Sequence, residues 1–367
     1  MDNKRNGAID LLKFLFGLMV VFYHGRKFVG SERMLFGAGF IAVEFFFLVS
    51  GYLMAAKAYS VSKKENLLPG KETSDYILKK VKTLFPHVLF AYILSLAVHF
   101  LITSDLVAFT KKAVFTVWEP FMLWMSGLGT NEIQINAQAW YISAMLLAML
   151  VLYPIMIKKF DLFTRVIAPI AAIFIFGWIS HEYGTLNHYR GWSGILYSGN
   201  LRAFAVLSLG AVCWQATQWL IRIPFTKLGR GMLSLVEVTC YLLVVVGANL
   251  HSHKALSFVM VAFLAVGITI TFSKKSLTGT CFDKKICYWL GNFSLTVYLQ
   301  HIMIRKYFEK NDLGLSYHKE LLIFIGIVLV WSLIAHFLMQ GIQKLSAIIW
   351  KKVKPALVES NEVPVNE

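Results

Sequence analysis

The sequence predicts an all-α fold: a polytopic membrane helical bundle of about ten transmembrane helices, N-in/C-in, with both termini on the cytoplasmic side. The first observation is composition, which is 57% hydrophobic and only 15% charged. Soluble domains are typically about 45–50% apolar and about 25% charged. The second is that apolar stretches of about 20 residues, the length that crosses a bilayer, recur along the whole chain. The third is that Lys and Arg fall in short clusters between these stretches.

Ten stretches are long and apolar enough to be spans. The predicted spans are 7–25, 36–56, 84–104, 139–157, 166–182, 199–219, 232–250, 257–273, 289–307 and 321–345. A further stretch, 113–127, is apolar but interrupted by Glu119 and Pro120. We expect a re-entrant or interfacial helix there, because a backbone break at membrane depth must be surrounded by protein or water. A complete crossing would instead move every later loop to the other side.

The distribution of basic residues sets the expected orientation. With ten spans, 23 of the 36 Lys and Arg residues lie on the cytoplasmic side, 12 lie outside, and Lys13 lies within the first span. Cytoplasmic loops carry such an excess, so the prediction is N-in and C-in, in the cell (plasma or inner) membrane. Residues 1–350 form one membrane domain in this interpretation. Residues 351–367 form a polar cytoplasmic tail that we expect to be disordered.

The net charge of +16 is not typical of nucleic-acid binding here, because the clusters face an anionic membrane surface. We therefore expect membrane lipids, and no nucleic acid, as partners. The basic segment 1–7 leads into an apolar run without a small-residue cleavage site, so the first span is predicted to be a signal anchor. The four Cys residues form no Cys-x-x-Cys pair, and neither a disulfide framework nor a metal site is expected.

Three ionisable residues lie in the first span: Asp10, Lys13 and His24. Each costs roughly 2.5–3.5 kcal/mol to insert, so such residues usually mark a function. At about 100° per residue all three share one stripe, with Lys13 and His24 about 16 Å apart along the axis. Asp10 and Lys13, at i,i+3, can neutralise each other. His24 has no partner in its own helix, and the alternative is an interfacial histidine bonded to headgroup or backbone.

The second span contains Glu44, which needs a partner; Lys13 or His24 on the neighbouring helix are the candidates. Its Ser50–Gly51 pair permits close helix packing.

Late in the chain, Ser294, Tyr298 and His301 fall within about 60° on one helical face. Near the outer end of the sixth span, the position of Arg202 alone favours snorkelling toward headgroups.

Six short motifs follow one another along the chain, each occurring once. They are Arg5, Asp10, Lys13 and His24; Glu44, Phe46, Phe47 and 50–53; 79–86, ending in Pro86; 140–143; Arg202 with Gly210; and 294–301. Over positions 5 to about 345 the chain resembles the acyltransferase type 3 integral membrane family, which includes bacterial O-acetyltransferases of cell-surface glycans. Two positions depart from the family pattern: Lys13 replaces an Arg, which gives up bidentate pairing, and Thr83 stands where an Arg is frequent.

The resemblance implies acyl transfer from cytosolic acyl-CoA, acetyl-CoA by default, to a hydroxyl of an extracytoplasmic glycan or lipid-linked saccharide. His24 would be a general base or an acyl relay, with Asp10 and Glu44 beside it in the catalytic set. Residues for CoA phosphates would be Lys13, Lys79, Lys80 and Lys82. Residues for substrate positioning would be Ser143, Arg202, Tyr298 and His301.

Two other classes of protein stay open. A proton-coupled secondary transporter would use the intramembrane Asp, Lys and His residues as a proton relay. No internal repeat is evident, which weakens that alternative. The other class is a membrane scaffold or sensor, but buried polar stripes are costly for a passive scaffold. A homodimer is compatible with the sequence.

Overall fold

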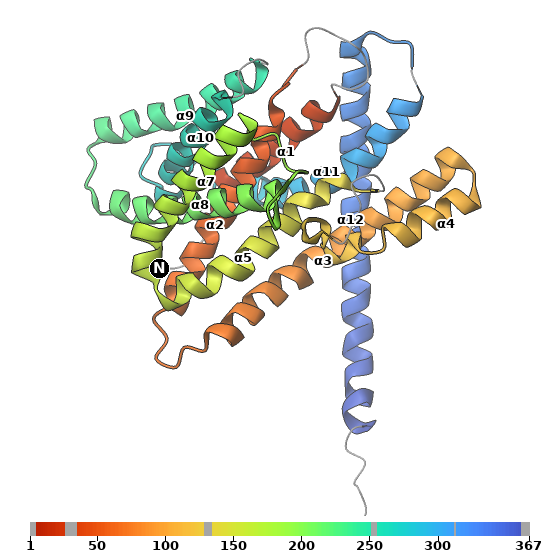
Figure 1. The fold of residues 1–367 in the computed structure, drawn as a ribbon, viewed down its shortest axis with the longest axis horizontal. Coiled ribbons are helices and arrows are strands. Elements are labelled where there is room, and N and C mark those ends of the chain that lie inside the picture. Colours follow the sequence, from red (N-terminus) through yellow and green to blue (C-terminus); the bar gives the residue numbers. More distant parts are fainter. Residues whose placement is uncertain (1–4, 26–34, 128–133, 251–254, 312, 361–367) are drawn as a thin grey trace, which may run out of the picture.

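The computed structural model describes residues 5–25, 35–127, 134–250, 255–311 and 313–360. The helices are α1 (Gly7–Gly25), α2 (Ala42–Val61), α3 (Pro69–Thr103), α4 (Leu106–Phe115), α5 (Trp140–Lys158), α6 (Phe160–Leu162), α7 (Ala168–Tyr183), α8 (Ser198–Arg222), α9 (Lys227–Asn249), α10 (Leu256–Ser273), α11 (Lys285–Lys310) and α12 (Tyr317–Ser360). The two strands, β1 (Trp192–Ser193) and β2 (Leu196–Tyr197), form one antiparallel hairpin. Figure 1 shows the helices gathered into a bundle, which confirms the all-α prediction.

Nine helical segments among the described residues are long and apolar enough to cross a membrane, and each overlaps one of the predicted spans. The third segment, Pro69–Thr103, begins 15 residues before the predicted 84–104. The tenth predicted span, 289–307, lies in α11, which has 26 residues. This helix packs against α1, α3 and α12, and side chains among its polar residues bond to α1 and α12. Thr296 lies 3.3 Å from His336 of α12, for example. Because these groups are satisfied by protein, α11 does not need an apolar surface.

We predicted that the interrupted stretch 113–127 would not form a complete span, and it does not. It is also not the single helix that was expected. It begins in α4, which ends at Phe115, and continues as two 3-10 helices, Glu119–Phe121 and Trp124–Ser126. Figure 1 shows α4 folding back beside the C-terminal end of α3. Asp105 caps the start of α4 by accepting from the backbone amides of Val107 and Ala108.

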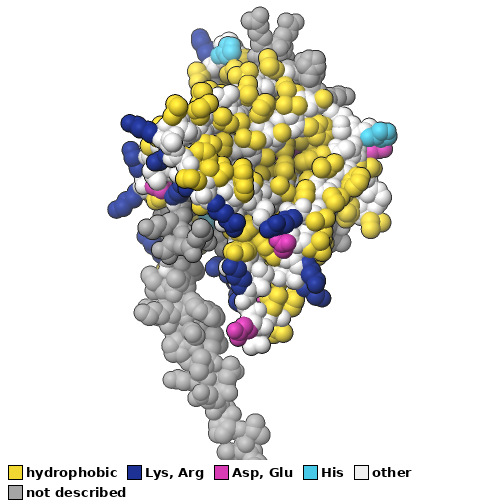
Figure 2. All heavy atoms as spheres, turned by 90° about the vertical axis from the view of Figure 1, so that its left-hand side faces the viewer, with side chains coloured by type: hydrophobic (Ala, Val, Ile, Leu, Met, Phe, Trp, Pro, Cys, Tyr) yellow, Lys and Arg dark blue, Asp and Glu magenta, His cyan; other side chains and the backbone are white. Residues whose placement is uncertain are grey.

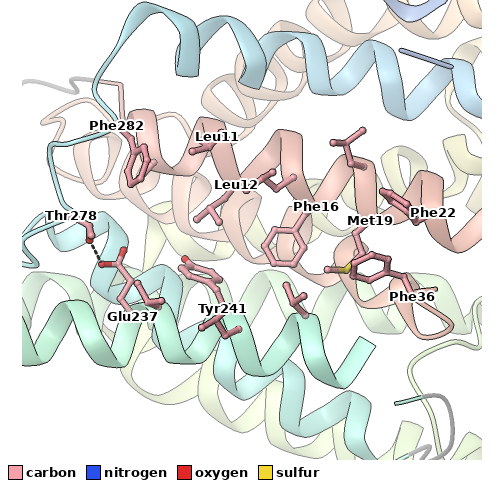
Figure 3. Close-up of a pocket in the computed structure, with 16 residues that line it drawn as sticks. Leu11, Leu12, Phe16, Met19, Phe22, Phe36, Glu237, Tyr241, Thr278 and Phe282 are labelled. Carbon is pink, nitrogen blue, oxygen red and sulfur yellow. Dashed lines mark hydrogen bonds between the residues drawn. The ribbon is translucent and has the colours of Figure 1, made fainter. Parts of the chain in front are cut away.

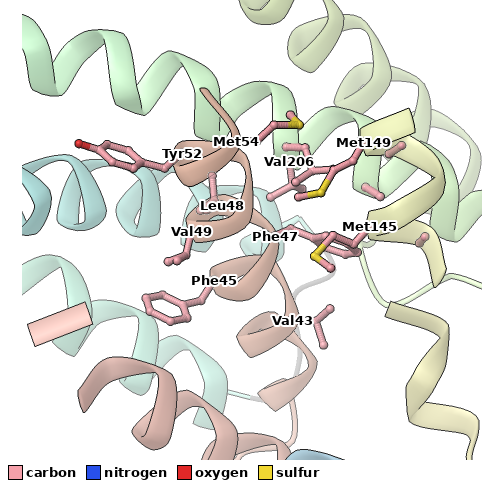
Figure 4. Close-up of a cluster of buried hydrophobic side chains, with 14 of the residues drawn as sticks. Val43, Phe45, Phe47, Leu48, Val49, Tyr52, Met54, Met145, Met149 and Val206 are labelled. Atoms are coloured by element: carbon pink, nitrogen blue, oxygen red, sulfur yellow. The ribbon is translucent and has the colours of Figure 1, made fainter. Parts of the chain in front are cut away.

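Helices α2 and α8 approach each other closely through glycine. A Cβ atom at Gly210 would lie 2.8 Å from the Tyr52 backbone nitrogen, and one at Gly51 would lie 2.8 Å from the Leu207 Cα atom. The close packing predicted from Ser50–Gly51 is therefore confirmed. Figure 4 shows the result, with Phe47 of α2 packed among Met145 and other buried side chains.

The outer surface is suited to lipid. Figure 2 shows one broad face that is mostly hydrophobic, with Lys and Arg gathered along its left and lower parts. Such an apolar exterior is what a bilayer selects. Which side each terminus faces remains a prediction. Residues 361–367 of the predicted tail lie outside the described residues, while α12 continues to Ser360.

Candidate active site

His24 lies in the last turn of α1 with neighbours at both ring nitrogens. Its Nδ1 atom lies 2.9 Å from the Val20 carbonyl oxygen and 3.2 Å from Nε2 of His301. Its Nε2 atom lies 2.9 Å from Nε2 of Gln138. A carbonyl oxygen can only accept, so we assign the proton to Nδ1 and the lone pair to Nε2. The neutral ring thus offers a base at Nε2.

Helix α11 provides the support behind this ring. His301 is fully buried, and its Nδ1 lies 2.8 Å from the Tyr298 carbonyl oxygen, so its Nε2 is left to accept from His24. The Tyr298 hydroxyl donates to the Gln138 carbonyl oxygen at 2.9 Å. Two predicted substrate residues therefore lie beside His24. The alternative, an interfacial histidine bonded to headgroup or backbone, is correct only for the backbone bond. His24 bonds to the Val20 carbonyl, but the side chains of Gln138 and His301 also surround its ring.

A cavity of about 320 Å³ opens beside His24. Its lining includes Gln138 and three arginines, Arg190, Arg202 and Arg305. This volume is at the lower end of the range for small-molecule sites, about 300–1,000 Å³. Arg202 is paired with Glu44 and Arg305 with Glu309, so the net positive charge of the lining comes chiefly from Arg190, and the lining is suited to a ligand that carries negative charge.

The opposite face of α1 lines a second, larger cavity against α9, of about 490 Å³ and almost entirely apolar (Figure 3). Its polar end is Glu237, whose carboxylate accepts from the hydroxyls of Thr271 and Thr278. His24 does not line this cavity, and neither do Val20, Gln138 and His301, the residues beside its ring nitrogens. Of these two cavities, the smaller one is therefore the candidate active site, because His24 lines it.

The partner of Glu44 is Arg202 of α8, and not Lys13 or His24 as the sequence suggested. Arg202 donates to Glu44 Oε1 from Nη2 and, at 3.0 Å, from Nε. The two side chains are 1% and 0% exposed. Arg202 also lies over the Trp140 ring, 5.1 Å from its centroid. The snorkelling interpretation of Arg202 was wrong, because a buried carboxylate holds the guanidinium inside the bundle.

Ser143 lies apart from the histidines. It is fully buried, and its Oγ accepts from the Met125 backbone amide at 2.8 Å. It is not among the residues that line the cavity beside His24. In the described part of the chain its role is therefore to hold the segment before α5.

A basic cluster lies at the other end of α1. Asp10 accepts from Arg5 and, at 3.0 Å, from Lys13, which confirms the predicted i,i+3 pair. Arg5 also donates to Asn292 Oδ1 of α11 at 2.8 Å. Gly291 of α11 lets Asp10 fit, since a Cβ atom there would lie 2.5 Å from the Asp10 Cβ atom. Both ends of the predicted stripe thus face α11.

The three lysines of α3 that were predicted to bind CoA phosphates differ in how far they are buried. Lys80 is half-buried, lies 5.2 Å from the centroid of the Tyr76 ring, and interacts electrostatically with Lys13. Lys79 and Lys82 are exposed. The basic cluster of this site is therefore Arg5, Lys13 and Lys80, with Asp10 among them.

Glu119 has a role that the sequence did not indicate beyond an acid interrupting an apolar stretch. Its two carboxylate oxygens accept from the backbone amides of Ile135, at 2.7 Å, and Asn136, at 2.8 Å. Asn136 in turn donates to the Leu299 carbonyl of α11 at 3.1 Å, and Lys306 donates to the Ile135 carbonyl at 2.6 Å. Burial raises the pKa of Glu119 to about 6, although these amide bonds oppose the shift. The acid fastens Ile135 and Asn136 to the 3-10 helix that begins at Glu119, and the bonds of Asn136 and Lys306 join the same segment to α11.

On the α10–α11 connection, Asp283 ties down the start of α1. Burial alone raises the pKa of Asp283, but the hydrogen bonds from Lys274 and from the Gly7 amide outweigh burial and lower it. This ionised carboxylate anchors α1 close to the basic cluster.

Fold and site together define a class: a multi-pass helical membrane protein whose first helix has a half-buried, hydrogen-bonded histidine at one end and a basic cluster at the other. A family model described as an acyltransferase domain matches residues 6–339, nearly the whole chain. The chain therefore belongs to the acyltransferase type 3 family and is a membrane acyltransferase. No curated protein and no solved structure matches it.

Proposed function

We propose that this protein is an O-acyltransferase of the cell membrane, moving an acyl group, acetyl by default, from cytosolic acyl-CoA to a hydroxyl of an extracytoplasmic polysaccharide or other cell-envelope glycan. The observation that carries the proposal is His24, whose Nε2 lone pair lies beside a basic cavity while its Nδ1–H is held by two acceptors. A neutral imidazole in this state can take a proton from a hydroxyl.

In the proposed reaction the acceptor O–H gives its proton to His24 Nε2 as the oxygen bonds to the acyl carbonyl carbon. The carbon–sulfur bond then breaks, and the CoA thiolate leaves and takes the proton from His24. The Val20 carbonyl and His301 Nε2, both accepting from Nδ1–H, stabilise the transient imidazolium. His301 thus orients the base, which is a positioning role.

The donor is proposed to bind at the basic cluster. Arg5, Lys13 and Lys80 present cationic groups for the CoA phosphates, and exposed Lys79 and Lys82 add to the local field. Lys13 and His24 are eleven residues apart, or about 16 Å along the helix axis. An extended arm, such as the pantetheine of acyl-CoA, is suited to bridge that interval. This proposal requires the N-in orientation.

The acceptor is proposed to bind at the cavity. Arg190, beside the ion-paired Arg202 and Arg305, favours an acceptor with phosphate or carboxylate groups, such as a lipid-linked saccharide. Glu44 acts through Arg202 by fixing the guanidinium, and Asp10 acts through Arg5 and Lys13.

The test uses membrane vesicles from cells that express the chain, supplied with acetyl-CoA labelled in the acetyl group. Label should appear in the envelope glycan fraction with wild type and not with His24→Ala at equal membrane level. His181→Ala is the matched control, because that histidine side chain is 86% exposed. Glycan labelling retained in His24→Ala would sink the catalytic role of His24. Comparison of surface glycans by mass spectrometry, with and without the gene, would identify the acceptor.

One observation favours a second candidate, a proton-coupled transporter: the direct His24–His301 contact is suited to a proton relay. Proton-driven solute uptake that does not depend on acyl-CoA would support it. Acyl transfer by the purified protein would exclude it as the primary activity.

A further inference from the structure

The side-chain amide of Gln138 is hydrogen-bonded to His24 Nε2, the atom that accepts the proton in the proposed reaction. Its Nε2 donates to the His24 Nε2 lone pair at 2.9 Å, and the residue lines the cavity while only 6% exposed. While that hydrogen bond lasts, His24 cannot accept a proton from a hydroxyl. A bound acceptor must therefore displace the amide from the lone pair.

The backbone of Gln138 is held independently of its side chain. The Tyr298 hydroxyl donates to its carbonyl oxygen, and the Glu119 carboxylate fastens the two amides of Ile135 and Asn136 just before it. When the side chain leaves His24, its amide stays within reach of the same place. A donor held in this way needs little reorganisation during a reaction.

Gln138 is not required to set the tautomer of His24. The Val20 carbonyl and His301 Nε2 already accept from Nδ1–H, which leaves the lone pair on Nε2 with or without the amide. An amide has two N–H donors, so the Gln138 side chain can serve as a donor at this position independently of the tautomer of His24.

We propose that Gln138 is a catalytic residue whose side-chain amide donates to the acyl carbonyl oxygen as that oxygen gains negative charge. The inference rests on the proposed acyl transfer. As the acceptor oxygen bonds to the carbonyl carbon, its proton passes to His24 Nε2 and the carbonyl π electrons move onto oxygen. That oxygen is one bond from the attacked carbon, so it lies close to His24 Nε2, where the displaced amide is held. The electron pair on oxygen then re-forms the C=O bond as the C–S bond breaks, and the negative charge leaves on the CoA thiolate, which takes the proton from His24.

The experiment compares Gln138→Glu, which has the shape of glutamine but no N–H donor when ionised, with Gln138→Ala. Gln134→Ala is the matched control, four residues earlier in the same segment, with a side chain that does not line the cavity. Labelled acetyl transfer and CoA release are measured in vesicles over a range of acetyl-CoA concentrations and pH. Membrane level and melting temperature are recorded for each variant.

We expect kcat to fall about 10²–10³-fold in both Gln138 variants, the loss typical of one removed oxyanion donor. The KM for acetyl-CoA and the apparent pKa of the pH–rate profile of Gln138→Ala should stay near wild type. Gln134→Ala should match wild type.

Two outcomes would overturn the inference. The first is activity within about threefold of wild type in Gln138→Glu, since the donor is then dispensable. The second is a Gln138→Ala variant that recovers wild-type kcat at a shifted pH, which would show that the amide only tunes His24. Failure of wild-type vesicles to transfer acetyl at all is a different result, because it would remove the proposed function itself.

Discussion

The Glu44–Arg202 pair offers the sharpest test of the tertiary structure. Glu44→Gln keeps the shape of the side chain but removes its charge, and so leaves the Arg202 guanidinium buried without a counter-ion. Both side chains are within 1% of complete burial, and one carboxylate oxygen accepts from two guanidinium nitrogens. Breaking a buried pair by removing one partner costs about 3–5 kcal/mol.

The assay is a double-variant cycle. The free energy of unfolding in detergent is measured for wild type, Glu44→Gln, Arg202→Met and the double variant. The double variant buries no unpaired charge, so its loss should be smaller than the sum of the single losses by about 1–3 kcal/mol. Asp161→Asn is the control, since its pair with Arg165 is 78% and 62% exposed and should be worth at most about 0.5 kcal/mol.

The reasoning would be refuted if Glu44→Gln were no less stable than Asp161→Asn, or if the two single losses simply added. Either result would mean that the guanidinium finds water or another partner. In that case Arg202 would not be held at the cavity by Glu44, and its proposed role in acceptor binding would lose its structural basis.

Four further predictions follow from other contacts. Gly210→Ala should lower the melting temperature markedly because its Cβ atom would meet the α2 backbone, whereas Gly177→Ala, with nothing within 4 Å, should not; equal melting temperatures would contradict the close approach. Because burial raises the pKa of Glu119 from 4.5 to about 6, the folded chain binds that proton more tightly than the unfolded chain. The melting temperature of wild type relative to Glu119→Gln should therefore rise as the pH falls from 6 to 4.5, and a difference independent of pH would disprove this. His301→Ala should lower kcat with little change in the KM for acetyl-CoA, measured by label transfer; an unchanged kcat would show that His24 is oriented without it. Lys80→Gln should raise the KM for acetyl-CoA several-fold at low salt and less at high salt, and a salt-independent effect would argue against phosphate binding.

Much of the fold follows from local rules. Hydropathy and length locate nine spans, because each helix meets the bilayer over its own 20 or so residues. The tenth predicted span, 289–307, lies in α11, which is not among these nine segments and whose polar groups bond to side chains of α1 and α12. The stripe of Asp10, Lys13 and His24 was predicted from the period of a single helix, and the structure does place both of its ends against α11.

The partners of those residues depended on tertiary structure alone. Glu44 and Arg202 are 158 positions apart, and His24 and His301 are 277 apart. Helical periodicity says which way a side chain points but not which helix lies there, so the wrong partners were assigned to Glu44. Gln138 carried no signal at all, since a glutamine before a helix is ordinary until a histidine from another helix is beside it.

By itself, then, the sequence determined a membrane bundle, its spans, the polar stripe of the first helix and, through ordered motifs, its family. Only the tertiary structure decided that the Gln138 amide donates to His24 Nε2, that Arg202 is held by Glu44, and that Glu119 fastens Ile135 and Asn136 just before Gln138. The physical reason is that insertion into lipid is governed by each segment on its own. A site is made by side chains from α1, α2, α8 and α11 that meet only when the bundle has packed.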